Sequence, residues 1–320
     1  MTNHRITMWL VILIPWFLIE PLTAKQMPEE NTIILSDKRI LSFETYGDPN
    51  GFPVFYFHGG QESRFSSGFM DSTAQQLGIR IIAPERPGIG NSSFQPNREF
   101  LDWPNDVSEL ADHLNIEKFS LFGLSGGSPH VLACLNSIPE RIEKASIVSG
   151  ATPDNYKKSR KGMWLPVRLI HWFAGMKSDK QLRKFIESDY QSILKKPNKR
   201  IKQLQKYLPK PDKELLKSNP NYGWEFINGS VESYKQGIEG VVQEWKLYVK
   251  DWGFDLKEII KPVTLWYGSS DKMTPKYKGY YLNNSLPNSE LHLIENEGHF
   301  SLIRNHLNNI LKNLHPAYSN

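Results

Sequence analysis

The chain has 320 residues, of which 39% are hydrophobic and 23% are charged, and this is the composition of an ordinary soluble globular protein. Its length can bury the core of one large α/β domain, with or without an insert, or of two smaller domains. The single cysteine, Cys134, excludes an internal disulfide, and the Cys and His residues have no zinc-ligand spacing. We therefore expect neither a disulfide nor a bound metal.

The formal net charge of +5 conceals an uneven distribution. Residues 154–217 contain 18 Lys and Arg against 6 Asp and Glu, whereas the rest of the chain contains 21 basic and 28 acidic residues. Such a basic block can attract nucleic acid or an anionic membrane surface, or it can simply keep helices in solution. Because no nucleic-acid-binding motif accompanies the charge, we expect no nucleic-acid partner, and a membrane surface is the other candidate.

The N-terminal segment has the pattern of an export signal. His4 and Arg5 precede the uncharged run ITMWLVILIPWFLI, residues 6–19, and small residues follow it. This run is shorter than the about 20 residues that a membrane-spanning helix needs, and it is typical of a secretory signal peptide. We assign residues 1–24 to a signal peptide or an uncleaved membrane anchor, with a buried first helix of the domain as a third alternative. The protein is expected to be exported or held at a membrane.

Downstream of this segment, short apolar runs alternate with helical patterns. The predicted strands are residues 32–35, 40–47, 53–60, 79–88, 118–124, 144–150, 261–271 and 289–299. The predicted helices lie near residues 67–77, 106–114, 128–137, 277–286 and 300–314. Strands that alternate with helices of about a dozen residues predict a mostly parallel α/β sheet covered by helices on both faces. The first two strands form an antiparallel hairpin at one edge.

Residues 155–255 interrupt this alternation. Apolar residues recur there at helical spacing, prolines stand at 166, 197, 209, 211 and 220, and no strand pattern appears. The segment predicts several short helices above the carboxyl edge of the sheet, where ligands bind in open α/β sheets. We therefore expect a core of residues 25–154 and 256–320 and a helical cap of residues 155–255. The aromatic residues of the cap predict a pocket for a small-molecule substrate with an apolar group.

One serine stands where a strand turns into a helix. Ser125, in the motif Gly123-Leu124-Ser125-Gly126-Gly127, follows the apolar run KFSLFGL and precedes the helix that begins near residue 128. This is the context that a G-x-S-x-G nucleophile elbow requires, because the serine occupies a strained turn and the glycines let the two backbones pass closely. Ser125 is the predicted nucleophile.

A serine hydroxyl needs a base to remove its proton, and the base needs a partner that orients it. His299 follows the last predicted strand and lies on a loop at the same edge of the sheet as Ser125, so it is the predicted base. Asp271, in WYGSSDKMTP, follows the preceding strand and gives the chain order Ser, Asp, His. Asp154, in SGATPD, is the alternative acid, and the capping of a helix is the alternative role for Asp271.

Backbone N–H groups that stabilise an oxyanion complete the predicted site. One is the amide of Gly126, directly after the nucleophile. The other comes from the loop His58-Gly59-Gly60-Gln61, with Gly60 as the first choice and Gln61 as the second. His58 is expected to brace this loop by hydrogen bonds.

Five motifs stand in an order and spacing that resemble those of the α/β-hydrolase family: FHGGQESR, APERPGIGNSS, FGLSGGSP, YGSSDKMTP and EGHF. The resemblance covers nearly all of residues 32–314 except the insert. It implies an eight-stranded sheet, a cap at residues 155–255, a serine nucleophile and no cofactor. Glu85 departs from the family, whose members often have Asp there, and Arg64 and Arg86 are expected to anchor loops near the active-site entrance.

The expected function is therefore a serine hydrolase that cleaves an ester or a related acyl bond through an acyl-enzyme. A peptidase or amidase and a carbon–carbon bond hydrolase use the same nucleophile and stay open as alternatives. A catalytically silent binding protein of the same fold is a further alternative. Epoxide and haloalkane hydrolases are disfavoured because Ser125 stands where they need an aspartate.

Overall fold

The computed structural model describes residues 31–156, 158–219 and 221–318. The predicted signal or anchor segment, residues 1–24, lies outside the described residues. Within these ranges, no helix has both the length and the apolar character needed to cross a membrane.

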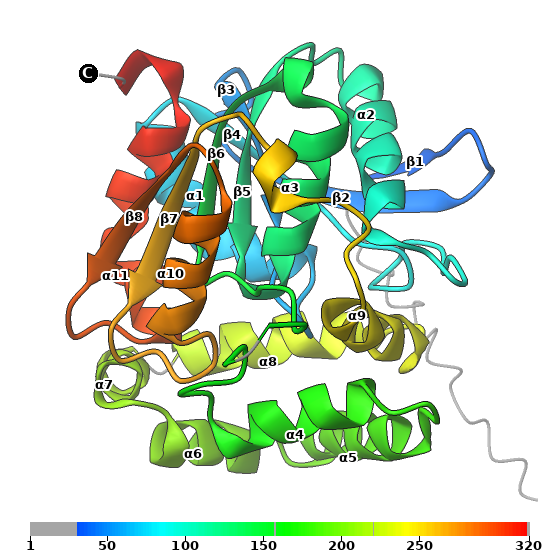
Figure 1. Ribbon diagram of the computed structural model, residues 1–320, viewed down its shortest axis with the longest axis vertical. Coiled ribbons are helices and arrows are strands. Elements are labelled where there is room, and N and C mark those ends of the chain that lie inside the picture. The colour runs from blue at the N-terminus through cyan, green and yellow to red at the C-terminus, as the bar shows by residue number, and fades with distance from the viewer. Residues whose placement is uncertain (1–30, 157, 220, 319–320) are drawn as a thin grey trace, which may run out of the picture. The chain divides into compact units, whose positions relative to one another are not determined.

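Eight strands form one sheet at the centre of the described chain (Figure 1). They are β1 Thr32–Ile34, β2 Ile40–Gly47, β3 Phe52–Phe57, β4 Ile79–Pro84, β5 Phe119–Leu124, β6 Ile142–Val148, β7 Val263–Gly268 and β8 Ser289–Ile294. Their order is β1-β2-β4-β3-β5-β6-β7-β8, and only the pairs β1–β2 and β2–β4 are antiparallel. The predicted eight-stranded, mostly parallel sheet with an antiparallel edge hairpin is confirmed.

Several strands end earlier than their apolar runs suggested. Strand β3 ends at Phe57 rather than at residue 60, and β4 ends at Pro84 rather than at residue 88. The remaining residues of both runs leave the sheet and form loops at its carboxyl edge. Those loops carry Gly60 after β3 and Glu85 and Arg86 after β4.

Helices cover both faces of the sheet because alternate strand residues are apolar on each side. Val54 and Tyr56 of β3 face the cluster that contains α1 and α11, whereas Phe55 and Phe57 face α2 and α3. The covering helices are α1 Asp71–Gln76, α2 Trp103–His113, α3 Ser128–Ser137, α10 Lys276–Ser285 and α11 His299–Leu314. The first of these is preceded by a 3-10 helix, Arg64–Met70, where the sequence predicted one continuous helix.

In the described part of the insert, six α-helices lie between β6 and β7. They are α4 Leu165–Ala174, α5 Lys180–Lys195, α6 Pro197–Tyr207, α7 Lys210–Ser218, α8 Asn221–Ser233 and α9 Glu239–Val249. Three of them, α4, α6 and α7, carry Pro at one of their first two positions, where its missing N–H is not needed. In Figure 1 these helices lie beyond the carboxyl ends of the strands, with α8 and α9 next to the sheet and α4 to α6 farther away.

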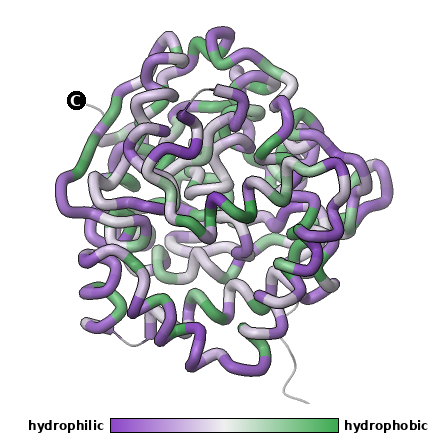
Figure 2. Tube along the Cα trace, turned by 60° about the horizontal axis from the view of Figure 1, so that its bottom comes forward, coloured by the Kyte–Doolittle hydropathy of each residue, from purple (hydrophilic) through white to green (hydrophobic). Residues whose placement is uncertain are grey.

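Hydrophobic and hydrophilic residues alternate along the insert helices, as Figure 2 shows from the side of the insert. Their apolar faces enclose a core of their own, which contains Ile170, Leu182, Ile186, Ile227 and Val241. Ile89 of the sheet domain belongs to the same cluster. The insert and the sheet therefore share packing, and the described residues form one compact unit.

Candidate active site

Ser125 occupies a strained turn between β5 and α3. Its φ of 51° lies in the left-handed region, which non-glycine residues rarely adopt and which costs about 1–3 kcal/mol. The turn requires glycine at position 123, because a Cβ there would lie only 2.7 Å from the Val131 side chain. A Cβ on Gly127 would collide with the backbone carbonyl of Phe57. The glycines of the motif are thus required by close backbone approach, as the sequence suggested.

His299 and Asp271 are brought together from two different loops. The His299 Nδ1 atom lies 2.8 Å from Asp271 Oδ2, and both side chains are buried. His299 is the first residue of α11, so its predicted position on a loop is wrong by one residue. Its backbone is consequently fixed by a helix terminus.

The Asp271 carboxylate is held in a rigid loop after β7. Its Oδ1 atom accepts the backbone N–H groups of Met273 at 2.7 Å and Thr274 at 3.0 Å. Its Oδ2 atom also accepts the Thr274 hydroxyl at 2.9 Å. Asp271 is not the N-cap of α10, since that position belongs to Pro275. These contacts aim the carboxylate at His299.

Charge attraction between the two side chains shifts both pKa values in the direction that favours an ion pair. Burial would raise the pKa of Asp271, but the His299 charge and hydrogen bond hold it below its ordinary value. Burial would lower the pKa of His299, but the charge of Asp271, followed by those of Asp212 and Glu62, raises it. The pair therefore stabilises a protonated imidazole.

Asp154, the alternative acid, contacts Arg160 and His171 of the insert rather than His299. Its carboxylate forms an ion pair with Arg160, with 2.9 Å between Arg160 Nε and Asp154 Oδ2, and it lies 3.8 Å from His171 Nδ1. Burial works to raise its pKa, but the nearby His171 and Arg160 side chains lower it well below the ordinary value. The structure pairs Asp271, and not Asp154, with His299.

Gly60 and Gly126 belong to two backbone segments in close contact. A Cβ placed on Gly126 would lie 3.0 Å from the backbone N of Gly60. The same Cβ would collide with the hydroxyl of Tyr248, which comes from α9 of the insert. Gln61 has a φ of 57°, and its side-chain amide donates to Tyr234 Oη at 2.6 Å. Both predicted donors, and the second choice Gln61, thus lie beside Ser125.

The loop with Gly60 is fixed by a buried arginine. Arg86 donates to the carbonyl oxygens of His58 at 2.7 Å and of Gly59 at 2.9 Å. Its Nε atom lies 2.7 Å from the carboxylate of Glu244, which comes from α9. The His58 ring nitrogen Nδ1 lies 2.9 Å from the Gly59 carbonyl. The loop-anchoring roles expected for Arg86 and His58 agree with these contacts.

Arg64 fixes the other end of this loop. Its guanidinium lies 2.6 Å from Glu85 and 3.0 Å from Glu232 of α8. Burial raises the pKa of Glu85 to about 7 even though Arg64 opposes the shift. Glu85, at the position where the resembled family often has Asp, thus pairs with Arg64.

A carboxylate of the insert caps the helix that begins with His299. Asp212 of α7 is buried, and it accepts the backbone N–H groups of His299 at 3.0 Å, Phe300 at 3.0 Å and Ser301 at 2.9 Å. N–H groups in the first turn of a helix have no partner within that helix, and the positive end of the helix dipole lies there and favours a negative charge. Asp212 therefore ties the insert to the backbone of His299. The sequence pattern had not singled out this residue.

The candidate residues open into one cavity of about 500 Å³ between the sheet and the insert. Ser125, Gly60, Gly126 and His299 line one end of it. Its other walls are mostly apolar and aromatic: Trp164, Leu165, Val167, Ile170, Phe185, Leu204, Tyr207, Phe226, Trp245, Met273 and Phe300. The arrangement places a nucleophilic hydroxyl and an apolar binding surface in the same space.

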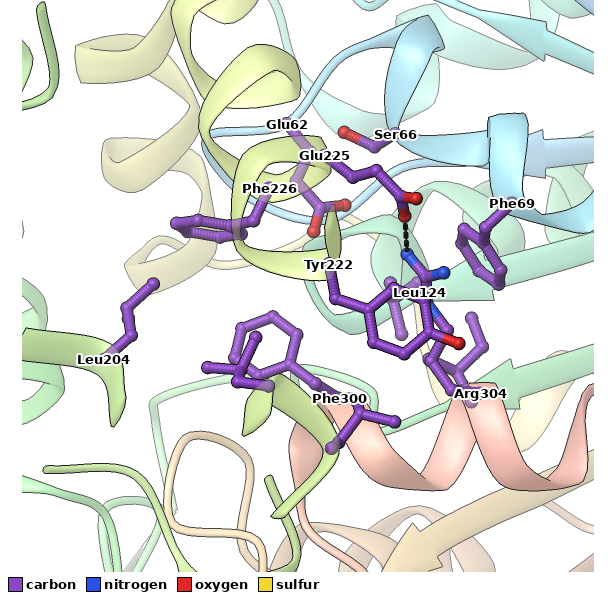
Figure 3. Close-up of a pocket in the computed structure, with 13 residues that line it drawn as sticks. Glu62, Ser66, Phe69, Leu124, Leu204, Tyr222, Glu225, Phe226, Phe300 and Arg304 are labelled. Atoms are coloured by element: carbon purple, nitrogen blue, oxygen red, sulfur yellow. Dashed lines mark hydrogen bonds and ion pairs between the residues drawn. The ribbon is translucent and has the colours of Figure 1, made fainter. Parts of the chain in front are cut away.

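A smaller cavity of about 50 Å³ adjoins the first and shares Glu62, Leu204, Phe226 and Phe300 with it. Figure 3 shows Arg304 of α11 at its far end, paired with Glu225 of α8 at 2.6 Å. The Arg304 guanidinium lies 3.8 Å from the centre of the Phe69 ring and 4.4 Å from that of Tyr222. The Arg304–Glu225 ion pair is a further contact between the insert and the core.

In the described ranges, no group of three or more His, Cys, Asp or Glu side chains is placed to bind a metal ion.

Comparison with known proteins places the chain in a family. The sequence model of the family described as the alpha/beta hydrolase fold matches residues 52–305. The chain belongs to the α/β hydrolase fold family, so the family suggested by its five motifs and the expectation of a hydrolase are confirmed.

Individual relatives agree with this assignment. The uncharacterized hydrolase YcgS of Bacillus subtilis is 28% identical over 104 residues, which are 32% of this chain and 36% of that protein. A putative proline iminopeptidase of Mycoplasma genitalium is 24% identical over 89% of this chain and 96% of its own length. The solved structure of the esterase EaEST from Exiguobacterium antarcticum superposes with a TM-score of 0.65 at 17% identity, over 88% of this chain and 97% of that one. The first of these matches spans about a third of the relative's length.

Proposed function

We propose that this hydrolase cleaves carboxylic esters through an acyl-enzyme formed on Ser125. The observation that carries the proposal is the strained Ser125 in the same cavity as a buried His299–Asp271 pair. The Ser125 hydroxyl attacks the substrate carbonyl and its proton passes to His299 Nε2, since Nδ1 faces Asp271. The amides of Gly60 and Gly126 stabilise the oxyanion, and Asp271 stabilises the imidazolium.

The second half of the reaction uses the same groups. His299 returns the proton to the leaving alcohol as the tetrahedral intermediate collapses to the acyl-enzyme. A water molecule then attacks the acyl carbon while His299 takes its proton. As this second tetrahedral intermediate collapses, the bond between the acyl carbon and Ser125 Oγ breaks, His299 gives the proton to Oγ, and the carboxylic acid is released. The apolar walls of the cavity favour an apolar acyl or alkyl group.

A peptidase is the alternative, because the Mycoplasma relative is named a putative proline iminopeptidase whereas the Exiguobacterium protein is an esterase. A free amino terminus would need an available carboxylate in the cavity. Of the two carboxylates that line it, Asp189 lies 2.9 Å from Arg200 and Glu62 accepts the Gly59 N–H at 2.8 Å. Both are already engaged, which favours a neutral ester.

A substrate panel on the purified protein tests this choice. We expect turnover of p-nitrophenyl esters with apolar acyl chains to exceed that of amino-acid arylamides and lactones. Faster hydrolysis of an arylamide with a free amino group than of any ester would establish the alternative.

The pH profile should report the His299–Asp271 pair. Protonated His299 cannot accept the Ser125 proton, so kcat/KM should rise with pH through the pKa of His299. Three carboxylates, Asp271, Asp212 and Glu62, raise that pKa. The midpoint of the rise in kcat/KM for a neutral ester is therefore expected at a pH above the ordinary histidine pKa of about 6.5. A midpoint below that value would contradict the pairing.

Replacing Asp212 with asparagine should lower this midpoint. The asparagine oxygen can still accept amide N–H groups of α11, but the negative charge beside His299 is lost. Helix-terminus charges contribute up to about 2 kcal/mol, so the plateau of kcat/KM at high pH should change far less than for a nucleophile variant. The control is Glu214→Gln on the same helix, whose side chain is 63% exposed. Identical midpoints for D212N and wild type would exclude an electrostatic role for Asp212.

We also propose that residues 1–24 direct the protein to export or to a membrane. The support is the basic start and uncharged apolar run of the sequence. N-terminal sequencing of the native protein should find a start near Lys25 if the segment is cleaved, or Met1 in the membrane fraction if it is retained. An intact Met1 in the soluble cytosolic fraction would contradict both forms of the proposal.

A further inference from the structure

The outer side of α4 exposes large apolar residues. Leu165, Leu169 and Trp172, which we call the α4 stripe, are 62%, 36% and 55% exposed. Their spacing of four and three residues places them on one side of the helix. Ile170 and Ala174, on the inner side, are buried in the core of the insert. Exposed apolar residues that gather in this way mark an interaction surface.

The α4 stripe continues onto α6. Tyr207, the last residue of α6, is 53% exposed, and its ring centre lies 6.2 Å from that of Trp164, the residue before α4. Both helices belong to the part of the insert that Figure 1 shows farthest from the sheet. Trp164, Leu165 and Tyr207 also line the cavity that contains Ser125. Leu169 and Trp172 are not among the residues that line it, so the cavity does not account for their exposed side chains.

Basic residues are exposed on α6, which ends at Tyr207, and on α4 itself. Lys199, Lys202 and Lys206 are exposed on α6 at a spacing that gives one face of the helix. The Lys206 ammonium lies 5.2 Å from the centre of the Tyr207 ring, and Arg168 is exposed within the α4 stripe. These residues belong to the block that has 18 basic and 6 acidic residues. Exposed aromatic and aliphatic residues flanked by lysine are typical of helices that lie on an anionic lipid surface.

We propose that the α4 stripe and the lysines of α6 dock on an anionic lipid surface. Charge selects this occupant, because a second copy of the chain placed symmetrically on the same face would oppose one basic block to another. Nucleic acid would satisfy the lysines but would offer no hydrocarbon layer for Leu165, Leu169 and Trp172. Leu165 also lines the cavity that contains Ser125, so docking would bring the mouth of that cavity to the lipid.

Hydrogen–deuterium exchange of the full chain with vesicles tests the docking independently of any catalytic activity. Vesicles of phosphatidylcholine with phosphatidylserine should protect residues 165–174 and 199–207, and high salt should weaken the protection. Vesicles of phosphatidylcholine alone should leave these residues unprotected. A segment 1–24 that inserts by its apolar run would bind both compositions, so it cannot produce this difference.

Two variants and two matched controls locate the surface. Trp172→Asp and the double variant Lys199→Glu/Lys202→Glu should weaken the phosphatidylserine-dependent binding by about tenfold or more. Ile260→Asp, at a residue 75% exposed outside the insert, and Lys118→Glu/Lys257→Glu should bind as wild type does. All four should melt at the wild-type temperature, because the substituted side chains are exposed.

Three results would overturn the proposal. The first is no protection on anionic vesicles, and the second is equal protection on neutral ones. The third is protection of residues 165–174 that grows with protein concentration in the absence of lipid, which would assign the surface to a second copy.

Discussion

Alanine at position 125 is expected to lower kcat/KM for a neutral ester by at least about 10⁴-fold, the order of loss seen when a serine nucleophile is removed from an established triad. In the proposed reaction, Ser125 Oγ is the protein atom that bonds to the acyl carbon, so neither His299 nor the oxyanion donors can replace it. The check is steady-state hydrolysis of the best p-nitrophenyl ester.

The loss must come from chemistry rather than from unfolding. Alanine removes one hydroxyl and keeps the Cβ that the φ of 51° already accommodates, so the melting temperature should change little. Ser137→Ala, at an exposed position on the last turn of α3, is the matched control and should keep wild-type kcat/KM. Retention of the wild-type rate by S125A would exclude Ser125 as the nucleophile.

Asparagine in place of Asp271 is expected to lower kcat by about 10⁴-fold, as it does in other triads. The amide has nearly the shape of the carboxylate, but it carries no charge to stabilise the protonated imidazole of His299. It also no longer fixes the tautomer in which Nδ1 carries the proton. Binding of the substrate should change much less, so the effect should appear in kcat rather than in KM.

The corresponding change at the alternative acid separates the two candidates. Asp154→Asn removes the ion pair with Arg160 and leaves the contact between His299 and Asp271 in place. It is therefore expected to reduce stability while keeping most of kcat. A small loss of kcat in D271N, together with a folded but inactive D154N, would show that Asp154 rather than Asp271 is the acid of the site.

The parts of the site that the sequence predicts are those with a local signature. Gly123, Ser125 and Gly127 can be recognised because a tight strand-to-helix turn leaves no room for side chains at the two glycines. His299 and Asp271 can be recognised because each follows a strand, and parallel strands bring their carboxyl ends to one edge. Strand lengths were overestimated where apolar runs continue into loops, as after Phe57 and Pro84.

The contacts between the insert and the site have no such signature. Asp212 caps the His299 helix from 87 residues away, and Glu244 reaches Arg86 from 158 residues away. Nothing in a short window around either carboxylate indicates a partner so distant in sequence. The local sequence around Tyr248, which lies against Gly126, likewise gives no indication of this contact.

The structure also gives a physical reason for the basic block. Three of its six acidic residues make internal contacts: Asp154 pairs with Arg160, Asp189 pairs with Arg200 at the cavity, and Asp212 is buried. Glu187 and Glu214 are exposed. Lysines such as Lys199 and Lys202 are exposed. Half of the acidic residues of this block thus serve internal contacts rather than balancing the lysines on its surface.

Covalent labelling tests the proposed nucleophile most directly. The folded protein would be treated with a fluorophosphonate, and the modified residue would be mapped by mass spectrometry of its peptides, with and without a competing ester. One phosphonyl group is expected per chain, on Ser125, and the label should be absent from S125A, slower to form in H299A and diminished by the ester. Labelling of a different residue, or undiminished labelling of S125A, would contradict an acyl-enzyme on Ser125.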